Sequence, residues 1–357
     1  MQIEVREMYS ALLARVTNAY SIAENLGIED QSLSKSLLDI VLANRLGHYL
    51  SEGGQGSDAH DTQQRHYEYK CTFTKQCIFH FGSNNGVERN IALAREKFQN
   101  ITGCYYAEFN SNGVERIAYC PMSSFLPQLE NHIRTRLKAG QFQWHHNWKT
   151  FTKIPNCVVI TSIGEATYPE LSESLIRAFV EAERLGVEPG FFSKGAHNHV
   201  FLAQREGHRL AITGGGPDAS DRDGKYEYKI SVYDAKCNFH FGARKSTVEN
   251  QALISSKCKG IAAAYVATRR FSTLIRIIRI PSADLERLLI AKEASTKGKQ
   301  LNLQLTRKEL RPFVVIPNPD YKWMNTTELK TELRTRKLTT SGKRAVLIER
   351  LTQHDLL

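Results

Sequence analysis

The sequence predicts a mixed α/β (α+β) protein in which two copies of one domain are followed by a small helical module. Segments with helical apolar spacing alternate with short apolar segments typical of strands. Several short patterns of the first half recur in the same order in the second half. From residue 325 the pattern changes to two short amphipathic helices. A chain of 357 residues is long enough for two or three domains, and we expect them at residues 1–150, 151–316 and 317–357.

The first element of each copy is a helix. Residues 36–47 and 174–186 both show helical apolar spacing, and both end at glycine, a frequent helix terminator. We therefore pair these two helices. With this pairing the second copy carries an extra segment at residues 187–209, which is either a surface insertion or a loop that contacts DNA.

The next element is a hairpin with an acidic motif, in which an aspartate precedes the turn and a glutamate and a lysine lie on the returning strand. The motif residues are Asp58, Glu68 and Lys70 in the first copy and Asp218, Glu227 and Lys229 in the second. Side chains alternate along a strand, so the glutamate and lysine of each copy share a face. The tyrosine between them points to the other face. The dipeptide Asp223-Gly224 favours a tight reversal in the second copy.

The remaining elements also recur. After the hairpin each copy has a Phe-His-Phe-Gly stretch, a helix, two apolar strands and a last helix that follows a proline. These segments are 79–82, 103–109, 116–121 and 123–133 in the first copy and 239–242, 262–267, 276–281 and 282–291 in the second, with the intervening helices opening near Val87 and Val248. Strands that alternate with helices predict a sheet with helices packed on it.

The composition favours a polyanionic partner. The chain has 48 Lys and Arg residues against 37 Asp and Glu residues, a net charge of +11, and nucleic acid is the usual partner of such proteins. No run of 18 apolar residues and no signal-peptide pattern is present, so we expect no contact with a membrane and a cytoplasmic location. None of the seven cysteines forms a CxxC pair, which fits a reducing compartment.

The repeated motif suits the hydrolysis of phosphodiesters. Carboxylates hold Mg²⁺, which neutralises charge on the phosphate and polarises a bound water. A lysine on the same strand face can approach the phosphate or the attacking water. A single Asp…Glu-x-Lys pattern is common by chance, but two copies in the same element context are a much stronger signal.

This pattern resembles the PD-(D/E)xK nuclease superfamily, over about residues 33–133 and 171–292, and Pro217 before Asp218 matches its optional proline. The resemblance implies two tandem restriction-endonuclease-like domains and a type II restriction enzyme that uses Mg²⁺, cuts both strands of double-stranded DNA and leaves 5′-phosphate ends. It also implies either a monomer with pseudo-dimeric repeats or a homodimer. The implied metal ligands are Asp58, Glu68, Asp218 and Glu227, the implied catalytic lysines are Lys70 and Lys229, and Asp61 and Asp221 are second-choice ligands.

The C-terminal segment resembles a SAP motif, a small helical module that binds DNA. Its expected core is Leu329, Leu333, Leu338, Leu347, Ile348 and Leu351. Lys337 stands where the motif usually has glycine, and Ser341-Gly342-Lys343 fits the turn. The candidates for contacts with DNA phosphates are Lys330, Arg334, Lys343 and Arg344.

Two other functions remain open from the sequence. One is a structure-directed or repair nuclease, and the other is a DNA-binding protein in which one or both centres are inactive. We expect His197-Asn198-His199 to be a polar loop. The tryptophans Trp144 and Trp148 could stack on bases, but we favour packing at a domain junction. His240 and its counterpart His80 either face the site or are structural.

Overall fold

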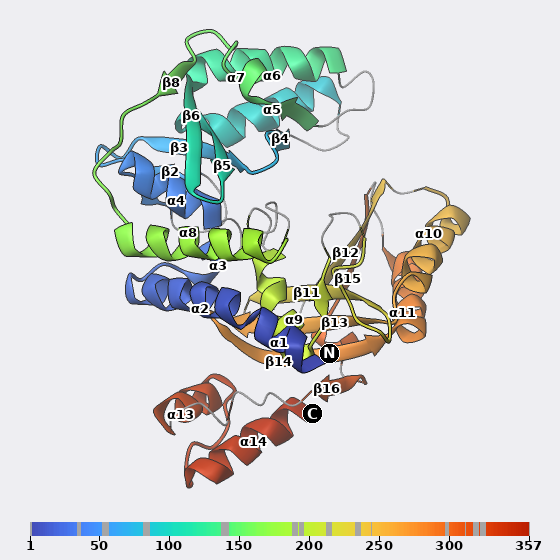
Figure 1. Ribbon diagram of the computed structural model, residues 1–357. Helices are drawn as coiled ribbons and strands as arrows, with labels where there is room; N and C mark the ends of the chain where they lie inside the picture. The colour runs from blue at the N-terminus through green and yellow to red at the C-terminus, as the bar shows by residue number, and fades with distance from the viewer. Residues whose placement is uncertain are drawn as a thin grey trace. The chain divides into compact units, whose positions relative to one another are not determined.

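A computed structural model shows helices packed on mixed sheets, which confirms the predicted fold class (Figure 1). The structure describes residues 2–33, 37–51, 57–80, 86–136, 143–187, 192, 196–211, 216–232, 237–243, 245–296, 300–310, 312–316, 321 and 326–356. The chain divides into two compact units. The first unit is Ser10–Asn198, and the second unit is Met1–Tyr9 together with His199–Leu357.

The first unit contains a six-stranded mixed sheet of order β1-β2-β3-β5-β6-β8. Its strands are Tyr49–Leu50, Ala59–His60, His66–Thr72, Ile101–Asn110, Gly113–Pro121 and Val158–Ile160. Only β3 and β5 are parallel, and the chain between them includes helix α5 (Val87–Phe98), as a parallel connection requires. Because β8 pairs with β6, this sheet extends past the domain boundary that we predicted at residue 150, and that boundary stays a prediction.

The second unit contains a six-stranded sheet with the equivalent order β9-β10-β11-β13-β14-β16. Its strands are Arg209–Leu210, Ala219–Ser220, Lys225–Val232, Ala263–Arg270, Thr273–Pro281 and Val314–Ile316. The register at the motif is also the same, since Glu68 lies opposite Cys104 and Glu227 lies opposite Ala264. Both long antiparallel pairs shift register at the same place, after Glu108 and after Thr268.

Each unit adds a two-stranded sheet, β4 with β7 in the first and β12 with β15 in the second. These strands are Cys77–His80, Gln143–His146, Cys237–Ala243 and Gln300–Leu305. The other helices of the first unit are α2 (Ser10–Asn25), α3 (Asp30–Leu33), α4 (Leu37–Leu46), α6 (Met122–Arg136), α7 (Trp148–Phe151), α8 (Pro169–Arg184) and the 3-10 turn Ala196–Asn198. The helices of the second unit are α1 (Gln2–Met8), α9 (His199–Glu206), α10 (Thr247–Lys259), α11 (Ser282–Ser295), α12 (Arg307–Leu310), α13 (Thr326–Thr335) and α14 (Arg344–Leu356). No helix of the described residues is both long and apolar enough to span a membrane.

The main core of each unit lies on one face of its six-stranded sheet. In the first unit α5 and α6 lie side by side against that face, and Phe79, Phe98 and Phe125 are almost fully buried there (Figure 1). In the second unit α10 and α11 pack on the equivalent face around Phe239 and Leu289. Each fully buried side chain of this size stabilises the fold by roughly 1.5–3 kcal/mol.

The pairing of residues 36–47 with 174–186 is wrong. Helix α9 comes directly before β9, just as α4 comes directly before β1, whereas α8 comes earlier in the chain. Helix α8 corresponds instead to α2, because Ala-Glu-Asn-Leu-Gly-Ile-Glu at 23–29 returns as Ala-Glu-Arg-Leu-Gly-Val-Glu at 182–188. Helices α2 and α4 were the two candidates for the counterpart of α8. Both have helical apolar spacing and both end near a Leu-Gly pair, so periodicity alone could not distinguish them.

The segment at residues 187–209 is therefore not an insertion. It contains α9, the counterpart of α4, and the first copy has a segment of the same kind at residues 28–49. Residues 188–191 and 193–195 lie outside the described part of the chain. The tryptophan prediction also needs correction, because Trp144 lies on β7 and packs with Phe79 and Phe125 in the core of the first unit.

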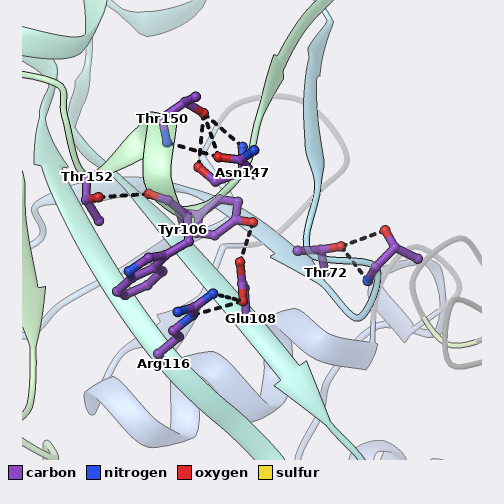
Figure 2. A network of polar contacts seen from close by, with 9 residues as sticks. Thr72, Tyr106, Glu108, Arg116, Asn147, Thr150 and Thr152 are labelled. Carbon is purple, nitrogen blue, oxygen red and sulfur yellow. Dashed lines mark hydrogen bonds and ion pairs between the residues drawn. The ribbon is translucent and has the colours of Figure 1, made fainter.

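A polar network fixes α7 to the first sheet (Figure 2). The hydroxyl of Tyr106 donates to Glu108 Oε1 at 2.9 Å, and Arg116 Nε and Nη2 donate to Glu108 Oε2 at 2.9 and 2.6 Å. The Arg116 guanidinium lies 4.4 Å from the ring centre of Trp148, the first residue of α7, and Asn147 caps that helix. Glu108 is only 1% exposed, so its charge depends on these partners.

Replacement of Glu108 by glutamine should lower the free energy of unfolding of the first unit by about 1–3 kcal/mol, because the Arg116 charge loses its buried partner. Denaturant unfolding followed by tryptophan fluorescence measures this, since Trp144 and Trp148 both lie in this unit. Glu115→Gln is the matched control, because Glu115 is exposed on the same strand. Equal midpoints for the two variants would contradict a stabilising role for the network.

Candidate active site

The motif aspartates are held in the same way in both units. Asp58 Oδ2 accepts the backbone N–H of Tyr69 at 2.6 Å, and Asp218 Oδ2 accepts the N–H of Tyr228 at 2.7 Å. In each case the donor is the residue between the glutamate and the lysine. This bond places the aspartate carboxylate beside the strand that carries Glu68 or Glu227, and both aspartates remain half-buried.

The motif glutamate and lysine form a buried ion pair in each unit. Lys70 Nζ lies 2.7 Å from Glu68 Oε1, and Lys229 Nζ lies 2.6 Å from Glu227 Oε1. Glu68 is 3% exposed and Glu227 is 5% exposed. The structure thus brings together the three residues predicted in each copy.

A second lysine, which the sequence reasoning missed, joins each pair. Lys97 in the last turn of α5 lies 3.0 Å from Glu68 Oε1, and Lys257 in the last turn of α10 lies 3.2 Å from Glu227 Oε1. The signal in the sequence was the spacing, because Lys257 follows Lys97 by the same interval at which Asp218 follows Asp58.

The repeated Phe-His-Phe-Gly stretch also has a place at the site. The amino group of Lys70 lies 5.3 Å from the ring centre of Phe79, and that of Lys229 lies 5.5 Å from the ring centre of Phe239. A ring face attracts a nearby cation, so these phenylalanines help to seat the buried lysines. Of the two repeated histidines, His240 is exposed and bonds to Asn302 Oδ1 at 2.7 Å, while the side chain of His80 lies outside the described part of the chain.

The charged groups of the first centre shift one another's pKa values. Burial and the neighbouring Glu68 raise the pKa of Asp58 to about 6. Burial alone would raise the pKa of Glu68, but Lys70 and Lys97 lower it below its ordinary value. The pKa of Glu227 is likewise lowered, because Lys229 and Lys257 outweigh the effect of burial. Both glutamates are therefore ionised at neutral pH.

Each centre offers an oxygen-donor set of two carboxylates. Among the described residues no group of three or more His, Cys, Asp or Glu side chains could hold a metal ion. Two carboxylates fit Mg²⁺, which binds through one or two protein carboxylates and completes its shell with water and substrate phosphate. Burial is the main cause of the raised pKa of Asp58 and the charge of Glu68 adds to it, so a divalent cation bound at this centre would favour the ionised carboxylate.

The second-choice ligands Asp61 and Asp221 shape the hairpin turns. Asp61 accepts the backbone N–H groups of Gln63 and Arg65 and the hydroxyl of Tyr67. Asp221 accepts two backbone N–H groups and a tyrosine hydroxyl in the same arrangement. Hydrogen bonds and Arg65 hold the pKa of Asp61 at about 2 despite burial. Their carboxylates are thus engaged within the turns.

A buried histidine behind each motif strand was also missed. His48 Nδ1 lies 2.7 Å from the Tyr69 hydroxyl, and its ring stacks on Tyr67 at 4.7 Å. His208 makes the same contacts with Tyr228 and Tyr226, at 2.7 and 4.0 Å. Each follows the glycine that ends α4 or α9, so the repeated Gly-His pair was the available signal.

One of the differences between these helices lies beside the motif aspartate. His199 in α9 lies with Nδ1 3.6 Å from Asp218 Oδ1, where α4 has Asp39. Burial lowers the pKa of His199, so the ring is neutral at neutral pH. The predicted polar loop at residues 197–199 is therefore wrong: His197 and Asn198 are buried, and both bond to the Tyr20 hydroxyl. Both contacts are with a residue distant in sequence, which local composition could not reveal.

The C-terminal module has the predicted core. Leu329, Leu333, Leu347 and Leu351 are fully buried, and Leu338 and Ile348 pack against them with Tyr321, which was not predicted. Of the candidate phosphate contacts, Arg334, Lys343 and Arg344 are exposed and Lys330 is half-buried. Lys337 has φ 58°, and the N–H groups of Lys337 and Leu338 bond to Arg334 and Leu333 carbonyls in a Schellman turn. A glycine would take this conformation without strain.

Comparison with known proteins supports this module. The SAP domain family matches residues 320–356, so the chain contains a SAP domain, which suggests nucleic-acid binding. No curated protein matches the chain.

Acidification should destabilise the fold through His48 and His208. Burial lowers the pKa of each from 6.5 to about 4, so the unfolded chain takes up protons first and stability is lost as pH falls from 6.5 toward 4. The variant His48→Phe/His208→Phe keeps the ring stacking but cannot titrate. Its unfolding midpoint should fall less between pH 7 and pH 5 than that of the wild type. His240→Phe, at an exposed position, serves as control, and an equal fall in all three proteins would refute this assignment.

Lys337→Gly should stabilise the SAP domain by about 0.5–1 kcal/mol, because it removes the strain of a side chain at positive φ. Hydrogen exchange read by mass spectrometry over α13 and α14 reports this as slower exchange. Lys337→Ala keeps the β-carbon and should bring no such gain. Faster exchange in Lys337→Gly would show that the turn is not strained.

Proposed function

We propose that this protein is a Mg²⁺-dependent endonuclease that hydrolyses phosphodiester bonds of double-stranded DNA, with one catalytic centre in each six-stranded sheet. The observation that carries the proposal is the same constellation in both units. In each unit the aspartate accepts the backbone N–H of the residue between the motif glutamate and the motif lysine. The buried glutamate pairs with that lysine, with 2.6–2.7 Å between Oε1 and Nζ. The SAP domain and the net charge of +11 support DNA as the partner.

The residues of each centre have distinct tasks in this reaction. Asp58 and Glu68, like Asp218 and Glu227, would hold Mg²⁺, which when bound neutralises the phosphate and lowers the pKa of a coordinated water. Lys70 and Lys229 are held by the glutamate and by a phenylalanine ring, so their amino groups are oriented before substrate arrives. The oxygen of water bonds to phosphorus and one of its O–H bonds breaks, the bond from phosphorus to O3′ breaks, and O3′ takes up a proton, so that the net step adds the elements of one water. The products are a 5′-phosphate and a 3′-hydroxyl.

The finer proposal is a type II restriction enzyme that cuts both strands with two centres in one chain. The same motif residues occur in both centres, which supports this proposal. A double-strand cut requires the hydrolysis of one phosphodiester bond in each strand. The SAP residues Lys330, Arg334, Lys343 and Arg344 would add sequence-independent affinity through phosphates. A nuclease that acts on branched or damaged DNA would use the same chemistry, and the two are distinguished by the products.

Plasmid cleavage with Mg²⁺ tests the proposal. Wild type should cut both strands of supercoiled plasmid and give discrete linear products. Lys70→Ala and Lys229→Ala should each only nick the plasmid. The double variant should lose activity by at least about 100-fold. Lys225→Ala is the matched control, because Lys225 is exposed at the start of the strand that carries Lys229.

The other outcomes have separate meanings. If one single variant is inactive and the other is like wild type, only one unit is catalytic. If wild type degrades branched substrates but leaves plasmid intact, the restriction assignment fails and a structure-directed nuclease replaces it. If wild type shifts DNA without cutting any substrate, the protein is a binding protein and the nuclease proposal is refuted.

A further inference from the structure

The two lysines at each buried glutamate are not equivalent. The side chain of Lys70 is 21% exposed and that of Lys97 is 44% exposed. In the second unit Lys229 is 25% exposed and Lys257 is 37% exposed. Each centre thus has an inner lysine from the motif strand and an outer lysine from the following helix.

The outer lysine retains hydrogen-bonding capacity. An ammonium group has three N–H donors. Lys70 uses two of them, on Glu68 Oε1 and on the backbone oxygen of Tyr69 at 3.0 Å. Within the described part of the chain Lys97 makes one hydrogen bond, to Glu68 Oε1, so two of its donors are not used there. Lys257 is placed in the same way, with its amino group 3.2 Å from Glu227 Oε1.

The charge balance before a metal ion binds also favours an outer lysine. Without a bound cation, one lysine and two carboxylates would leave a net negative charge that repels a phosphate. With two lysines the four ionised groups of the first centre, Asp58, Glu68, Lys70 and Lys97, sum to zero. The outer lysine, whose side chain is the more exposed of the two, then offers its positive charge to an approaching anion.

We propose that Lys97 and Lys257 bind a phosphate of the DNA backbone at the mouth of each centre. This inference rests on the proposed function, because it takes DNA as the substrate of both centres. Each ammonium keeps its bond to the glutamate and donates a second hydrogen bond to a non-bridging phosphate oxygen. The two lysines therefore have different roles. The inner lysine is fixed inside the site, and the outer lysine binds the substrate.

A purely structural role would have different consequences. A lysine in the last turn of a helix is stabilised by the helix dipole, and Lys97 and Lys257 would then serve only to neutralise the buried glutamates. Their removal would change stability or nothing, and it would not alter how binding depends on salt. The number of phosphate contacts, by contrast, sets the slope of log K against log salt concentration.

The test measures binding of a labelled duplex by fluorescence anisotropy over a range of salt, in EDTA so that no cleavage occurs. Each phosphate contact on duplex DNA contributes about 0.9 to the slope, so Lys97→Met/Lys257→Met should reduce its magnitude by about 1.8. Lys97→Arg/Lys257→Arg should restore the wild-type slope, because arginine also donates to phosphate. Thermal melting checks that the methionine variant is folded, which we expect because Lys70 and Lys229 still pair with the buried glutamates.

Lys153→Met/Lys259→Met provides the matched control, with one exposed lysine removed from each unit. A slope of the methionine variant equal to that of wild type overturns the inference, and so does an equal reduction in this control. With Mg²⁺, the variant should also show a KM about 10-fold higher. If wild type cuts no DNA at all, the proposed function fails, while the salt slope still decides the role of the two lysines.

Discussion

The arrangement of each unit depends on keeping one glutamate ionised while almost no water reaches it. An ionised carboxylate without water or partners is too costly to bury. Removing the partner of a buried ion pair therefore lowers the free energy of unfolding by several kcal/mol. Glu68 and Glu227 therefore need their amino groups, which come from two separate elements. The parallel neighbours of β3 and β11 require a crossover, and the crossover helices α5 and α10 deliver the second lysine.

Around this constant feature the two units have different neighbours. On the face of the sheet that carries the motif, Tyr106 lies opposite Lys70, whereas Val266 lies opposite Lys229. One step further along the strands, the first unit has Glu108 and the second has Thr268. Only the first can therefore build the Glu108 network that fixes α7. The backbone register tolerates both solutions because it is set by main-chain hydrogen bonds and by the bulge.

The sequence predicted what depends on local pattern and failed where a partner is distant. Alternation along a strand was enough to place Glu68 beside Lys70, and apolar spacing was enough to define the leucine core of the SAP domain. The helix pairing failed because two helices with similar spacing and the same Leu-Gly end competed for one position. Lys97 and His48 were not predicted. Lys97 lies in a helix turn and His48 in a loop, and both reach the motif only through the tertiary fold.

A comparison of the two units separates packing from chemistry. Buried positions outside the motif have changed residue type, since Tyr106 is matched by Val266 and Ala118 by Ile278. The aspartate, the glutamate, both lysines and the phenylalanine above the inner lysine are the same in both units. A buried charged cluster brings little stability, and apolar residues of similar volume serve a core equally well or better. Its presence twice, in the same geometry, therefore supports the proposed role of these groups at a substrate over a role in folding alone.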